Sequence, residues 1–462
     1  MIVAKAYKGK TIGVFGLARS GLSVAESLRA SGANVLAWDD NAATRKEVSF
    51  ELTDLYGVDF AKLDGLVVAP GVPLTHPQPH ALIDKANQAG VTVFGDMDVF
   101  AASVNNMPDH KLVAITGTNG KSTTTALLAH VLNAAGADAA LGGNIGVPIL
   151  NLKPLAEGGT YVFEVSSFQI DLMQSFKADI AILLNVTPDH LDRHGNMQGY
   201  VQSKSRLFDM QNDDQVAIVG VDDVYGMDLA YNLTQRVVPI SVERELPIGV
   251  YVLGAKLYDA MEGDGKPKFI GSLAGCQALK GDHNGQNAAA VYAAARLLGL
   301  SSDEILEGFE SFPGLRHRLQ VVGEKDGVLY IDDSKASNTD AAQKALLAYD
   351  DIHWIAGGRL KEDDLSALDI ALGKVKHAYL VGEAADQLAK FLKGKVTISK
   401  TDTINKAVQE ASKKAASGEV VLLAPACASF DQYTDFEARG RDFVAAVAGV
   451  GANIIINEGE LP

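Results

Sequence analysis

A short glycine-containing segment carries the residue types that bind phosphate groups. Residues 117–122 read GTNGKS and lie between the hydrophobic run LVAIT and the amphipathic run STTTALLAHVLNAAG. Lys121 can neutralise phosphate oxygens, the Ser122 hydroxyl can ligate Mg²⁺, and the backbone amides can surround an anion. Where the usual phosphate-binding loop has its first glycine, this sequence has Ile115. We therefore predict a nucleotide-binding loop of a shortened form.

Two later segments place possible metal ligands at the ends of expected strands. TYVFEVSSFQI ends a strand at Glu164, and ADIAILLNVTPDHLDRHG delivers Asp189 and His190 to the end of the next. Carboxylates beside a phosphate loop are natural ligands of Mg²⁺. The alternatives are that Glu164 caps the following helix and that His190, like most single histidines, has a structural role.

A lysine occurs on the apolar face of a predicted helix. In GYVQSKSRLFDM, Tyr200, Lys204, Leu207 and Phe208 share one face. Burial lowers the pKa of a lysine, and a neutral amine can react with CO₂ to form a carbamate that approaches Mg²⁺ as a carboxylate does. The alternative is that the side chain extends to solvent, which spacing alone favours.

Three further segments offer polar groups for a nucleotide. GDHNGQN places Asn284 and Asn287 at a helix start, where amides can contact adenine or simply cap the helix. GLRHRLQ supplies Arg318, which can contact a γ-phosphate as an arginine finger. VLYIDDSKASN supplies Asp333, which can accept a hydrogen bond from a ribose hydroxyl.

The elements that position these groups follow an alternating pattern. Short β-branched runs alternate with amphipathic stretches, which is typical of parallel sheets covered by helices. The pattern restarts twice, so we predict an α/β protein of three domains, at residues 1–109, 110–313 and 314–462. The first and third are expected to be Rossmann-like, and the second a P-loop ATPase-like domain with a mostly parallel sheet. Residues 223–280 are expected to form a β-rich appendage.

The first strand–loop–helix unit is close to a dinucleotide-binding fingerprint. TIGVFGLARSG precedes a helix, and a strand ending in Asp39 follows about 20 residues later. Ala18 replaces the middle glycine, which disfavours a nicotinamide dinucleotide and an oxidoreductase. A related diphosphate can still bind at the helix N-terminus. The alternative is that this unit, and the turn at Gly71, bind no ligand.

Bulk composition limits the possible partners. The chain has 462 residues, with 41 Lys plus Arg against 57 Asp plus Glu, a formal charge of −16. This charge argues against nucleic-acid or anionic-membrane binding. Cys276 and Cys427 lack metal-ligand spacing and are expected to be reduced thiols of a cytoplasmic protein. We find neither a signal peptide nor an apolar run of about 18 residues, and we expect a monomer.

Together these segments resemble a known enzyme family. GTNGKS, VFEVSSFQ, LLNVTPDHLDRHG, the helix with Lys204, GDHNGQN and GLRHR occur in the order seen in the Mur ligases. These are ATP-dependent amide-forming enzymes of peptidoglycan precursor synthesis, and their phosphate loop has the shortened form. DDSKASN at residues 332–338 and APACASFDQYTDFEARG at residues 424–440 resemble the D-glutamate-adding branch.

The resemblance implies a reaction and its cofactors. The enzyme would use ATP and one or two Mg²⁺ ions to phosphorylate the carboxylate of UDP-N-acetylmuramoyl-L-alanine. The amine of D-glutamate would then attack the acyl phosphate, giving the amide, ADP and phosphate. Lys204 would be carbamylated. Competing interpretations are another ligase of the superfamily and an ATP-hydrolysing regulator that needs no amino acid.

The resemblance also implies roles for individual residues. Expected catalytic residues are Lys121, Lys204, His190, Glu164 and Arg318. ATP would contact Gly117, Thr118, Asn119, Gly120, Lys121, Ser122, Thr123, Asn284, Asn287, Arg318 and Asp333. Metal ligands would be Ser122, Glu164, His190 and carbamylated Lys204. The UDP-sugar would contact Arg19, Ser20, Asp39, Gly71 and Asn144. D-Glutamate would contact Asp189, Lys335, Ser337, Lys361, Ser429 and Phe436, with Ser337 where the family usually has threonine.

Overall fold

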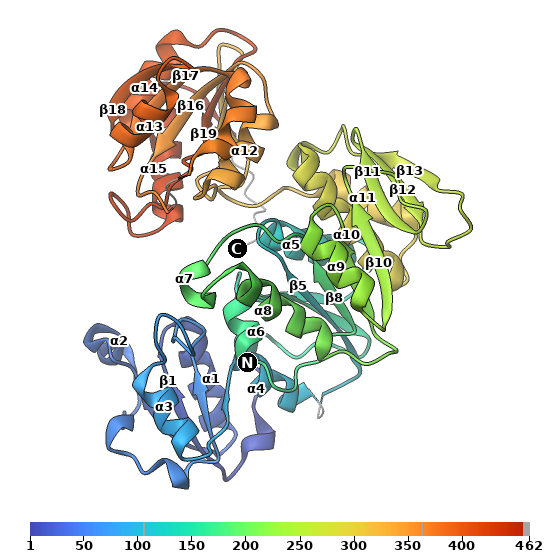
Figure 1. Cartoon of the computed structure of the whole chain (residues 1–462), viewed down its shortest axis with the longest axis vertical. Coiled ribbons are helices and arrows are strands. Elements are labelled where there is room, and N and C mark those ends of the chain that lie inside the picture. Colours follow the sequence, from blue (N-terminus) through green and yellow to red (C-terminus); the bar gives the residue numbers. More distant parts are fainter. Residues whose placement is uncertain (105–106, 362–363, 456–462) are drawn as a thin grey trace. The chain divides into compact units, whose positions relative to one another are not determined.

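The computed structural model describes residues 1–104, 107–361 and 364–455 (Figure 1). The chain divides into two compact units, which are described separately. The first unit comprises Met1–Ser272 and Gln286–Phe309, and the second comprises Leu273–Gly285 and the chain from Glu310 onward. In the described part of the chain, no helix is long and apolar enough to cross a membrane.

The first unit begins with a four-stranded parallel sheet in the order β2-β1-β3-β4. Its strands are β1 (Thr11–Phe15), β2 (Asn34–Trp38), β3 (Gly65–Val68) and β4 (Val93–Phe94). Its helices are α1 (Arg19–Ala30), α2 (Ala42–Glu47), α3 (Ala81–Gln88) and α4 (Asp96–Val104), with short 3₁₀ turns at Lys5–Tyr7, Leu55–Gly57 and Phe60–Lys62. The strand–turn–helix opening expected after Thr11 is confirmed.

A nine-stranded sheet follows in the order β13-β12-β11-β10-β9-β8-β5-β7-β6. The strands are β5 (His110–Thr116), β6 (Ala139–Gly143), β7 (Gly159–Glu164), β8 (Ile180–Leu183), β9 (Val216–Gly220), β10 (Arg236–Ser241), β11 (Gly249–Leu253), β12 (Lys256–Ala260) and β13 (Lys268–Ser272). Only the pairs β11–β12 and β12–β13 are antiparallel. The sheet is therefore mostly parallel, as predicted.

Helices and turns connect these strands or follow β13 along the chain. They are α5 (Lys121–Ala134), α6 (Ser167–Leu172), α7 (Leu191–His194), α8 (Met197–Asp209), α9 (Val224–Asn232), α10 (Asp282–Leu297), α11 (Ser302–Ser311) and 3₁₀ turns at Ile149–Asn151 and Gln277–Leu279. The segment expected to be a β-rich appendage does contain strands, β10 to β13, and they extend the central sheet, because β10 pairs with β9 in parallel and β11 to β13 continue from it.

The second unit contains a mixed sheet in the order β18-β17-β16-β19-β15-β14-β20. Its strands are β14 (Gln320–Lys325), β15 (Val328–Asp332), β16 (Ile352–Gly357), β17 (Val375–Val381), β18 (Thr397–Asp402), β19 (Val420–Leu423) and β20 (Asn453–Ile454). Its helices are α12 (Thr339–Leu347), α13 (Ala385–Leu392), α14 (Ile404–Lys414), α15 (Phe436–Gly449) and the 3₁₀ helix η6 (Ser366–Lys374). The strands β15 to β19 pair with one another in parallel, whereas β14 is antiparallel to β15 and β20.

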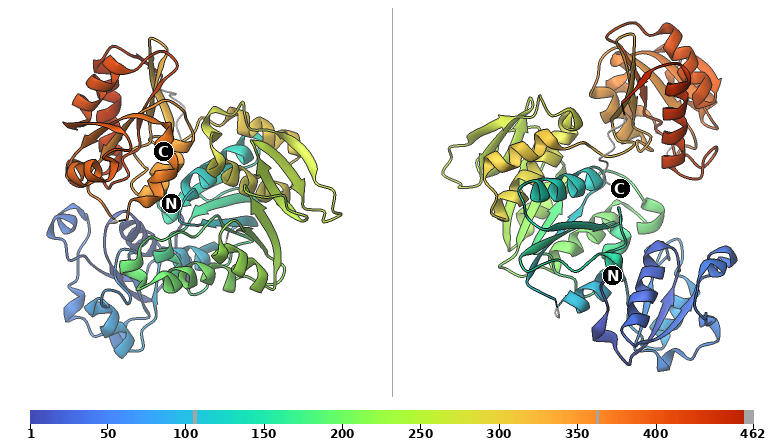
Figure 2. Two further views of the ribbon diagram at one scale, coloured as in Figure 1. Left: turned by 45° about the horizontal axis from the view of Figure 1, so that its top comes forward. Right: turned by 180° about the vertical axis from the view of Figure 1, so that it is seen from behind.

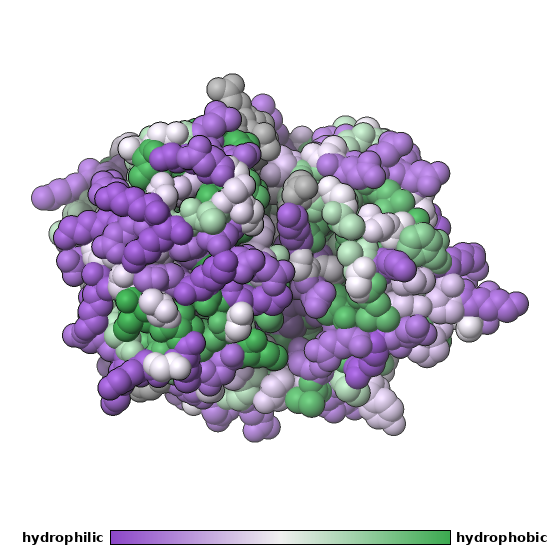
Figure 3. Space-filling model, turned by 90° about the horizontal axis from the view of Figure 1, so that it is seen from above, coloured by the Kyte–Doolittle hydropathy of each residue, from purple (hydrophilic) through white to green (hydrophobic). Residues whose placement is uncertain are grey.

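Alternation along the strands explains why helices cover both faces of this sheet (Figure 2). Trp354 packs in a core with α12, η6 and α13, whereas its neighbour Ile355 packs in a second core with α14 and α15. Successive side chains of a strand point to opposite faces, so a strand buried on both sides is apolar throughout. On the molecular face drawn in Figure 3, hydrophilic side chains predominate, and hydrophobic ones form separate groups among them.

Candidate active site

The predicted phosphate loop lies between β5 and α5 in the first unit. Gly117 and Gly120 have φ values of 150° and 87°, where glycine is favoured. A Cβ atom on Gly120 would lie 2.3 Å from Oδ1 of Asn287, so the loop passes too close to that amide for a side chain. Ile115 is a fully buried strand residue that pairs with Glu164. The strand therefore continues through the position of the usual first glycine, and the loop is correspondingly short.

The Lys121 side chain folds back over the loop. Its Nζ donates hydrogen bonds of 2.8 Å to the carbonyl oxygens of Gly117 and Thr118. Ser122, the next residue of α5, is 7% exposed. A cation and a hydroxyl are thus held beside the loop and the first turn of the helix, where a phosphate is favoured by the helix dipole.

Side chains from the end of β8 and from α8 and α10 support the loop. The carbonyl oxygen of Asn185 accepts a 2.9 Å hydrogen bond from the Thr118 amide. Oδ1 of the same residue accepts a 2.9 Å hydrogen bond from the Asn119 amide. The Thr118 hydroxyl lies 3.2 Å from the hydroxyl of Tyr200. Asn287 accepts a hydrogen bond of 3.0 Å from the Thr124 hydroxyl, so this expected ATP contact also braces α5.

Lys204 is buried against the same loop. It is 2% exposed, its Nζ lies 4.5 Å from the Tyr200 ring centroid, and it donates a 3.0 Å hydrogen bond to the Gly117 carbonyl oxygen. The interpretation that this side chain extends to solvent is therefore wrong. Burial, followed by the nearby charge of Lys121, lowers the pKa of Lys204 well below its usual value, although Asp189 and Asp171 oppose the shift.

Glu164 ends β7 with one carboxylate oxygen unsatisfied by the protein. The side chain is 2% exposed, and its Oε1 accepts a 2.7 Å hydrogen bond from Nδ2 of Asn144. Its Oε2 is buried without a hydrogen-bond partner. Because a buried unpaired oxygen is costly, this atom fits a site for a divalent cation. The amide of Asn144, which we expect to contact the UDP-sugar, faces this carboxylate.

His190, the N-cap residue before α7, has an unusual backbone conformation. Its φ is 52°, its Nε2 lies 3.6 Å from Oδ2 of Asp189, and its ring centroid lies 4.9 Å from that of Phe168. Among the residues that the structure describes, no three or more His, Cys, Asp or Glu side chains are grouped to hold a metal ion.

The expected UDP-sugar contacts lie around the first sheet. Asp39 closes the turn before α1, because its Oδ2 accepts a 2.6 Å hydrogen bond from the Leu17 amide. Arg19 starts α1 and donates to the Gly146 carbonyl oxygen, and Ser20 follows it half-buried. The carbonyl oxygen of Gly71 accepts a 3.0 Å hydrogen bond from Nη1 of Arg193 on α7.

In the second unit the expected amino-acid contacts cluster at strand ends. Lys335 lies with its Nζ 4.0 Å from the ring centroid of Phe436, and Nζ of Lys361 donates a 3.4 Å hydrogen bond to the Ser337 hydroxyl. Ser429 is 3% exposed in the turn after β19. Asp189, the remaining expected contact for D-glutamate, belongs to the first unit.

Sequence reasoning missed an internal arginine that links these segments. Arg439 on α15 is 1% exposed, and its Nη2 and Nη1 donate to the carbonyl oxygens of Ser334 at 2.7 Å and Cys427 at 2.9 Å. Burial lowers its pKa to about 10. Its position in the helix FEARGRDF carried no signal of burial, because the segment resembles an exposed, charged turn of helix.

Arg318 and Asp333 also occur in the second unit. Asp333 is 9% exposed, and its pKa is raised to about 7, mainly by burial. The charge of Arg318 lowers this pKa, and the charge of Asp332 raises it. Asp332 is fully buried and its Oδ2 lies 2.7 Å from Nδ1 of His317. Asn284 is buried in the first turn of α10 and its Nδ2 donates a 2.9 Å hydrogen bond to the Lys280 carbonyl oxygen.

Comparison with protein families agrees with this arrangement. Residues 115–295 match the model of the Mur ligase middle domain, which spans the phosphate loop, Lys204 and Asn287. Residues 317–427 match the model of the Mur ligase glutamate ligase domain. The chain belongs to the Mur ligase family.

Two similar proteins from different bacteria share the name UDP-N-acetylmuramoylalanine--D-glutamate ligase. The chain is 45% identical over 465 residues to the UDP-N-acetylmuramoylalanine--D-glutamate ligase of Caulobacter vibrioides, covering 98% of each chain. It is also 45% identical over 468 residues to the ligase of the same name from Rhizobium meliloti, covering 99% of this chain and 100% of that one.

Solved structures share the fold at lower identity. A MurF ligase from Thermotoga maritima in complex with ADP aligns with a TM-score of 0.59 and 17% identity, covering 97% of this chain and 98% of that chain. The UDP-N-acetylmuramate-alanine ligase from the same organism aligns with a TM-score of 0.58 and 18% identity, covering 96% of this chain and all of that chain.

Proposed function

We propose that this chain is an ATP-dependent ligase that joins D-glutamate to UDP-N-acetylmuramoyl-L-alanine in peptidoglycan precursor synthesis. Relatives that carry this name match it at 45% identity over nearly their whole length. The observation that carries the proposal is the grouping of the Gly117 carbonyl, Lys121 and buried Lys204 around the phosphate loop. The proposal covers three functional domains, at residues 1–109, 110–313 and 314–462.

The reaction must first activate a carboxylate. A free carboxylate is a poor acyl donor because oxide is a poor leaving group. Transfer of the γ-phosphoryl group of ATP to a carboxylate oxygen releases ADP and forms an acyl phosphate. Both reactants are anions, so Lys121 and Arg318 would screen them, and the loop amides would hold the β- and γ-phosphates.

The site also fits a divalent cation. Ser122, Glu164, His190 and a carbamate on Lys204 would hold Mg²⁺, which supplies charge neutralisation at the phosphates when it is bound. The unpaired Oε2 of Glu164 supports this assignment. The lowered pKa of Lys204 supports the carbamate, because only the neutral amine reacts with CO₂. ATP use follows from family membership, whereas Mg²⁺ and the carbamate are our proposals.

The second step needs an amino acid held as a dianion. Lys335 and Lys361 would bind the carboxylates of D-glutamate, with the hydroxyls of Ser337 and Ser429 and the ring of Phe436 beside them. The D-glutamate amine would attack the acyl carbon, and phosphate would leave with the oxygen that it had received from the carboxylate. Asp189 would be a further contact of D-glutamate.

The UDP-sugar would bind at the first sheet. The loop before α1, with Arg19 and Ser20, presents a helix N-terminus to a diphosphate. Asp39 and Gly71 would lie beside it, and Asn144 would contact the sugar from the turn after β6. We propose that the enzyme is cytoplasmic and acts as a monomer.

An amino-acid panel tests the proposal. The full chain is incubated with ATP, Mg²⁺ and UDP-N-acetylmuramoyl-L-alanine, with each amino acid supplied in turn, and products are identified by mass. D-Glutamate should give a product heavier by one glutamyl residue, and L-glutamate should not. ATP turnover that is independent of any amino acid would instead support the regulator, and a product with another amino acid would support another ligase.

A further inference from the structure

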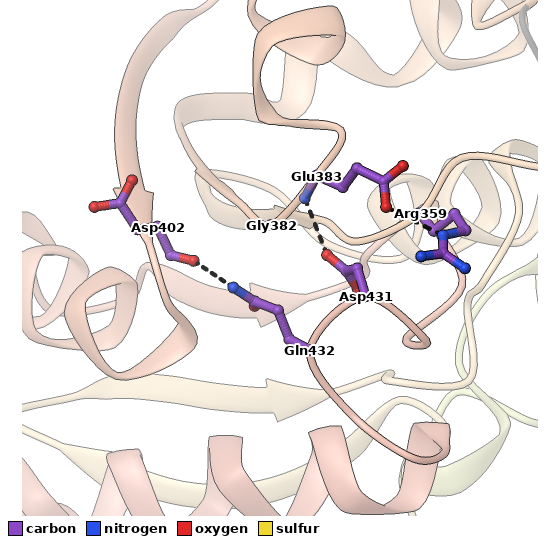
Figure 4. Close-up of a pocket in the computed structure, with 6 residues that line it drawn as sticks. All are labelled: Arg359, Gly382, Glu383, Asp402, Asp431 and Gln432. Atoms are coloured by element: carbon purple, nitrogen blue, oxygen red, sulfur yellow. Dashed lines mark hydrogen bonds and ion pairs between the residues drawn. The ribbon is translucent and has the colours of Figure 1, made fainter.

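A polar hollow of about 350 Å³ lies at one edge of the sheet of the second unit. Its walls come from the ends of β16, β17 and β18 and from the turn after β19 (Figure 4). The lining residues are Arg359, Gly382, Glu383, Asp402, Asp431 and Gln432. Open α/β sheets bind ligands at the carboxyl ends of their parallel strands. The hollow therefore lies on the edge that carries Lys361 and Ser429.

One side chain in this hollow bonds to the backbone of a distant helix start. Oδ2 of Asp431 accepts a 3.0 Å hydrogen bond from the amide of Glu383, 48 residues earlier (Figure 4). Glu383 precedes Ala384, the N-cap of α13, which makes no side-chain capping bond. Asp431 thus adds, from another loop, a carboxylate near the N-terminus of α13, whose first turn contains Asp386 and whose cap residue makes no side-chain hydrogen bond.

The backbone at this contact leaves room for the carboxylate only because residue 382 is glycine. Gly382 has a φ of 68°, and a Cβ atom there would lie 2.2 Å from Oδ2 of Asp431. A side chain at this position would displace the carboxylate and would strain the backbone as well. The glycine at position 382 therefore allows the close contact between the turn after β19 and the turn after β17.

Asp431 belongs to the same turn as Ser429. The carbonyl oxygen of Ser429 accepts hydrogen bonds from the amides of Tyr433 at 2.9 Å and Gln432 at 3.2 Å, which close the turn around Asp431. The side chain of Gln432 donates a 3.0 Å hydrogen bond to the Asp402 carbonyl oxygen, a second tie to the sheet (Figure 4).

The same turn is also joined to the segment that carries Lys361. Ala428 and Arg359 exchange two backbone hydrogen bonds of 2.8 and 2.9 Å, so the residues before Ser429 and before Lys361 run side by side. Nε of Arg359 lies 3.1 Å from Oε2 of Glu383. Glu383 is also the residue whose backbone amide donates the hydrogen bond to Asp431. Movement of the Asp431 turn would therefore displace both expected contacts of the amino acid.

We propose that Asp431 is a positioning residue for the amino-acid substrate. Its hydrogen bond to the Glu383 amide holds the turn that begins at Ser429, and through Arg359 it orients the Lys361 segment. This inference rests on the proposed function, because it assigns D-glutamate to these residues. Asp431 acts through the turn and makes no contact with the reacting atoms. Its loss should therefore weaken amino-acid binding and leave the binding of ATP and the UDP-sugar intact.

The test compares steady-state constants of the full-length wild type with three variants. Asp431→Ala removes the acceptor and should raise KM for D-glutamate about tenfold, with KM for ATP and the UDP-sugar changed by less than about twofold. Asp431→Asn keeps an acceptor oxygen and should recover most of the loss. Glu419→Gln is the control, because Glu419 lies at the opposite ends of the strands. There its Oε2 forms a 2.9 Å hydrogen bond with Nε2 of His353. This variant should lower the melting temperature of the protein without changing KM for D-glutamate.

The outcomes separate this inference from the function. A wild type whose turnover does not require D-glutamate contradicts the proposed function and the inference with it. A wild type that requires D-glutamate, with Asp431→Ala leaving its KM unchanged, overturns only the positioning role, and so does an Asp431→Asn variant as impaired as Asp431→Ala. If Asp431→Ala does not fold, Gly382→Ala replaces it and should give the same selective rise in KM, and an unchanged KM there overturns the role.

Discussion

The Nζ atom of Lys204 donates a hydrogen bond of 3.0 Å to the carbonyl oxygen of Gly117, across 87 residues of sequence. The bond joins α8 to the first glycine of the phosphate loop. It places a buried amine with a lowered pKa beside the expected phosphates. The chemistry that we propose for this amine can be tested by removing it.

Replacing Lys204 with alanine should lower kcat by about 100-fold or more, because a charge-stabilising group at the phosphates is lost. A short carboxylate such as acetate, added to the assay, should restore part of the activity by occupying the place of the carbamate. Phosphate release measured with increasing acetate gives the result.

Lys204→Arg is the matched control for that rescue. Its larger guanidinium cannot form the carbamate and fills the space that the added carboxylate needs, so acetate should not restore activity. Full activity of Lys204→Ala without acetate would contradict the carbamate role.

Gly120→Ala should raise the dissociation constant of ATP by about tenfold or more. Gly120 has a φ of 87°, and the added Cβ would lie 2.3 Å from Oδ1 of Asn287, so the loop must move. Calorimetric titration of the full chain with ATP measures the change. Gly136→Ala at the other end of α5 is the control, because Gly136 has a φ of 83° with nothing near the added Cβ.

Both glycine variants should lose stability from the backbone strain, but only Gly120→Ala should lose affinity. Equal ATP affinities in the two variants would show that the space around Gly120 is not used by the nucleotide site.

Asp333→Asn should change how stability depends on pH. Burial raises the pKa of Asp333 from 3.8 to about 7, so between these values the folded state binds a proton that the unfolded state lacks. The stability that this carboxyl contributes is therefore present below its unfolded pKa and is lost as pH rises through about 7. Asparagine resembles the neutral acid and should keep that stability.

Melting temperatures of both proteins between about pH 5 and about pH 8 measure this difference. The variant should already melt slightly above the wild type at about pH 5, and the gap should widen up to about pH 7 and then stay constant. A constant offset across the range would contradict the raised pKa.

Local patterns predicted much of this structure. The strand–glycine–lysine–helix pattern around Lys121 is local, and the structure has β5, the loop and α5 in the expected places. The alternation of strands and helices likewise predicted three α/β sheets, including the mostly parallel central one. The domain boundaries stay a prediction, since contacts divide the chain into two compact units.

Long-range contacts could not be predicted in the same way. Spacing favoured a solvent-exposed Lys204, because burial there depends on the Gly117 carbonyl and the Tyr200 ring, which periodicity does not locate. Only the family resemblance indicated the buried state. The extension of the central sheet by β10 to β13 also escaped prediction, because strand pairing is not visible in one sequence. Arg439 is a similar case, since its two partners, Ser334 and Cys427, lie in loops outside α15.

The most direct test of the account follows the oxygen atoms. UDP-N-acetylmuramoyl-L-alanine is prepared with an oxygen-isotope label in its carboxylate and is converted with ATP and D-glutamate by the full chain. The account predicts that the released phosphate carries a labelled oxygen from the carboxylate, because the acyl phosphate breaks at its acyl carbon. Unlabelled phosphate, formed at the same rate as the product, would contradict activation of the carboxylate by phosphoryl transfer.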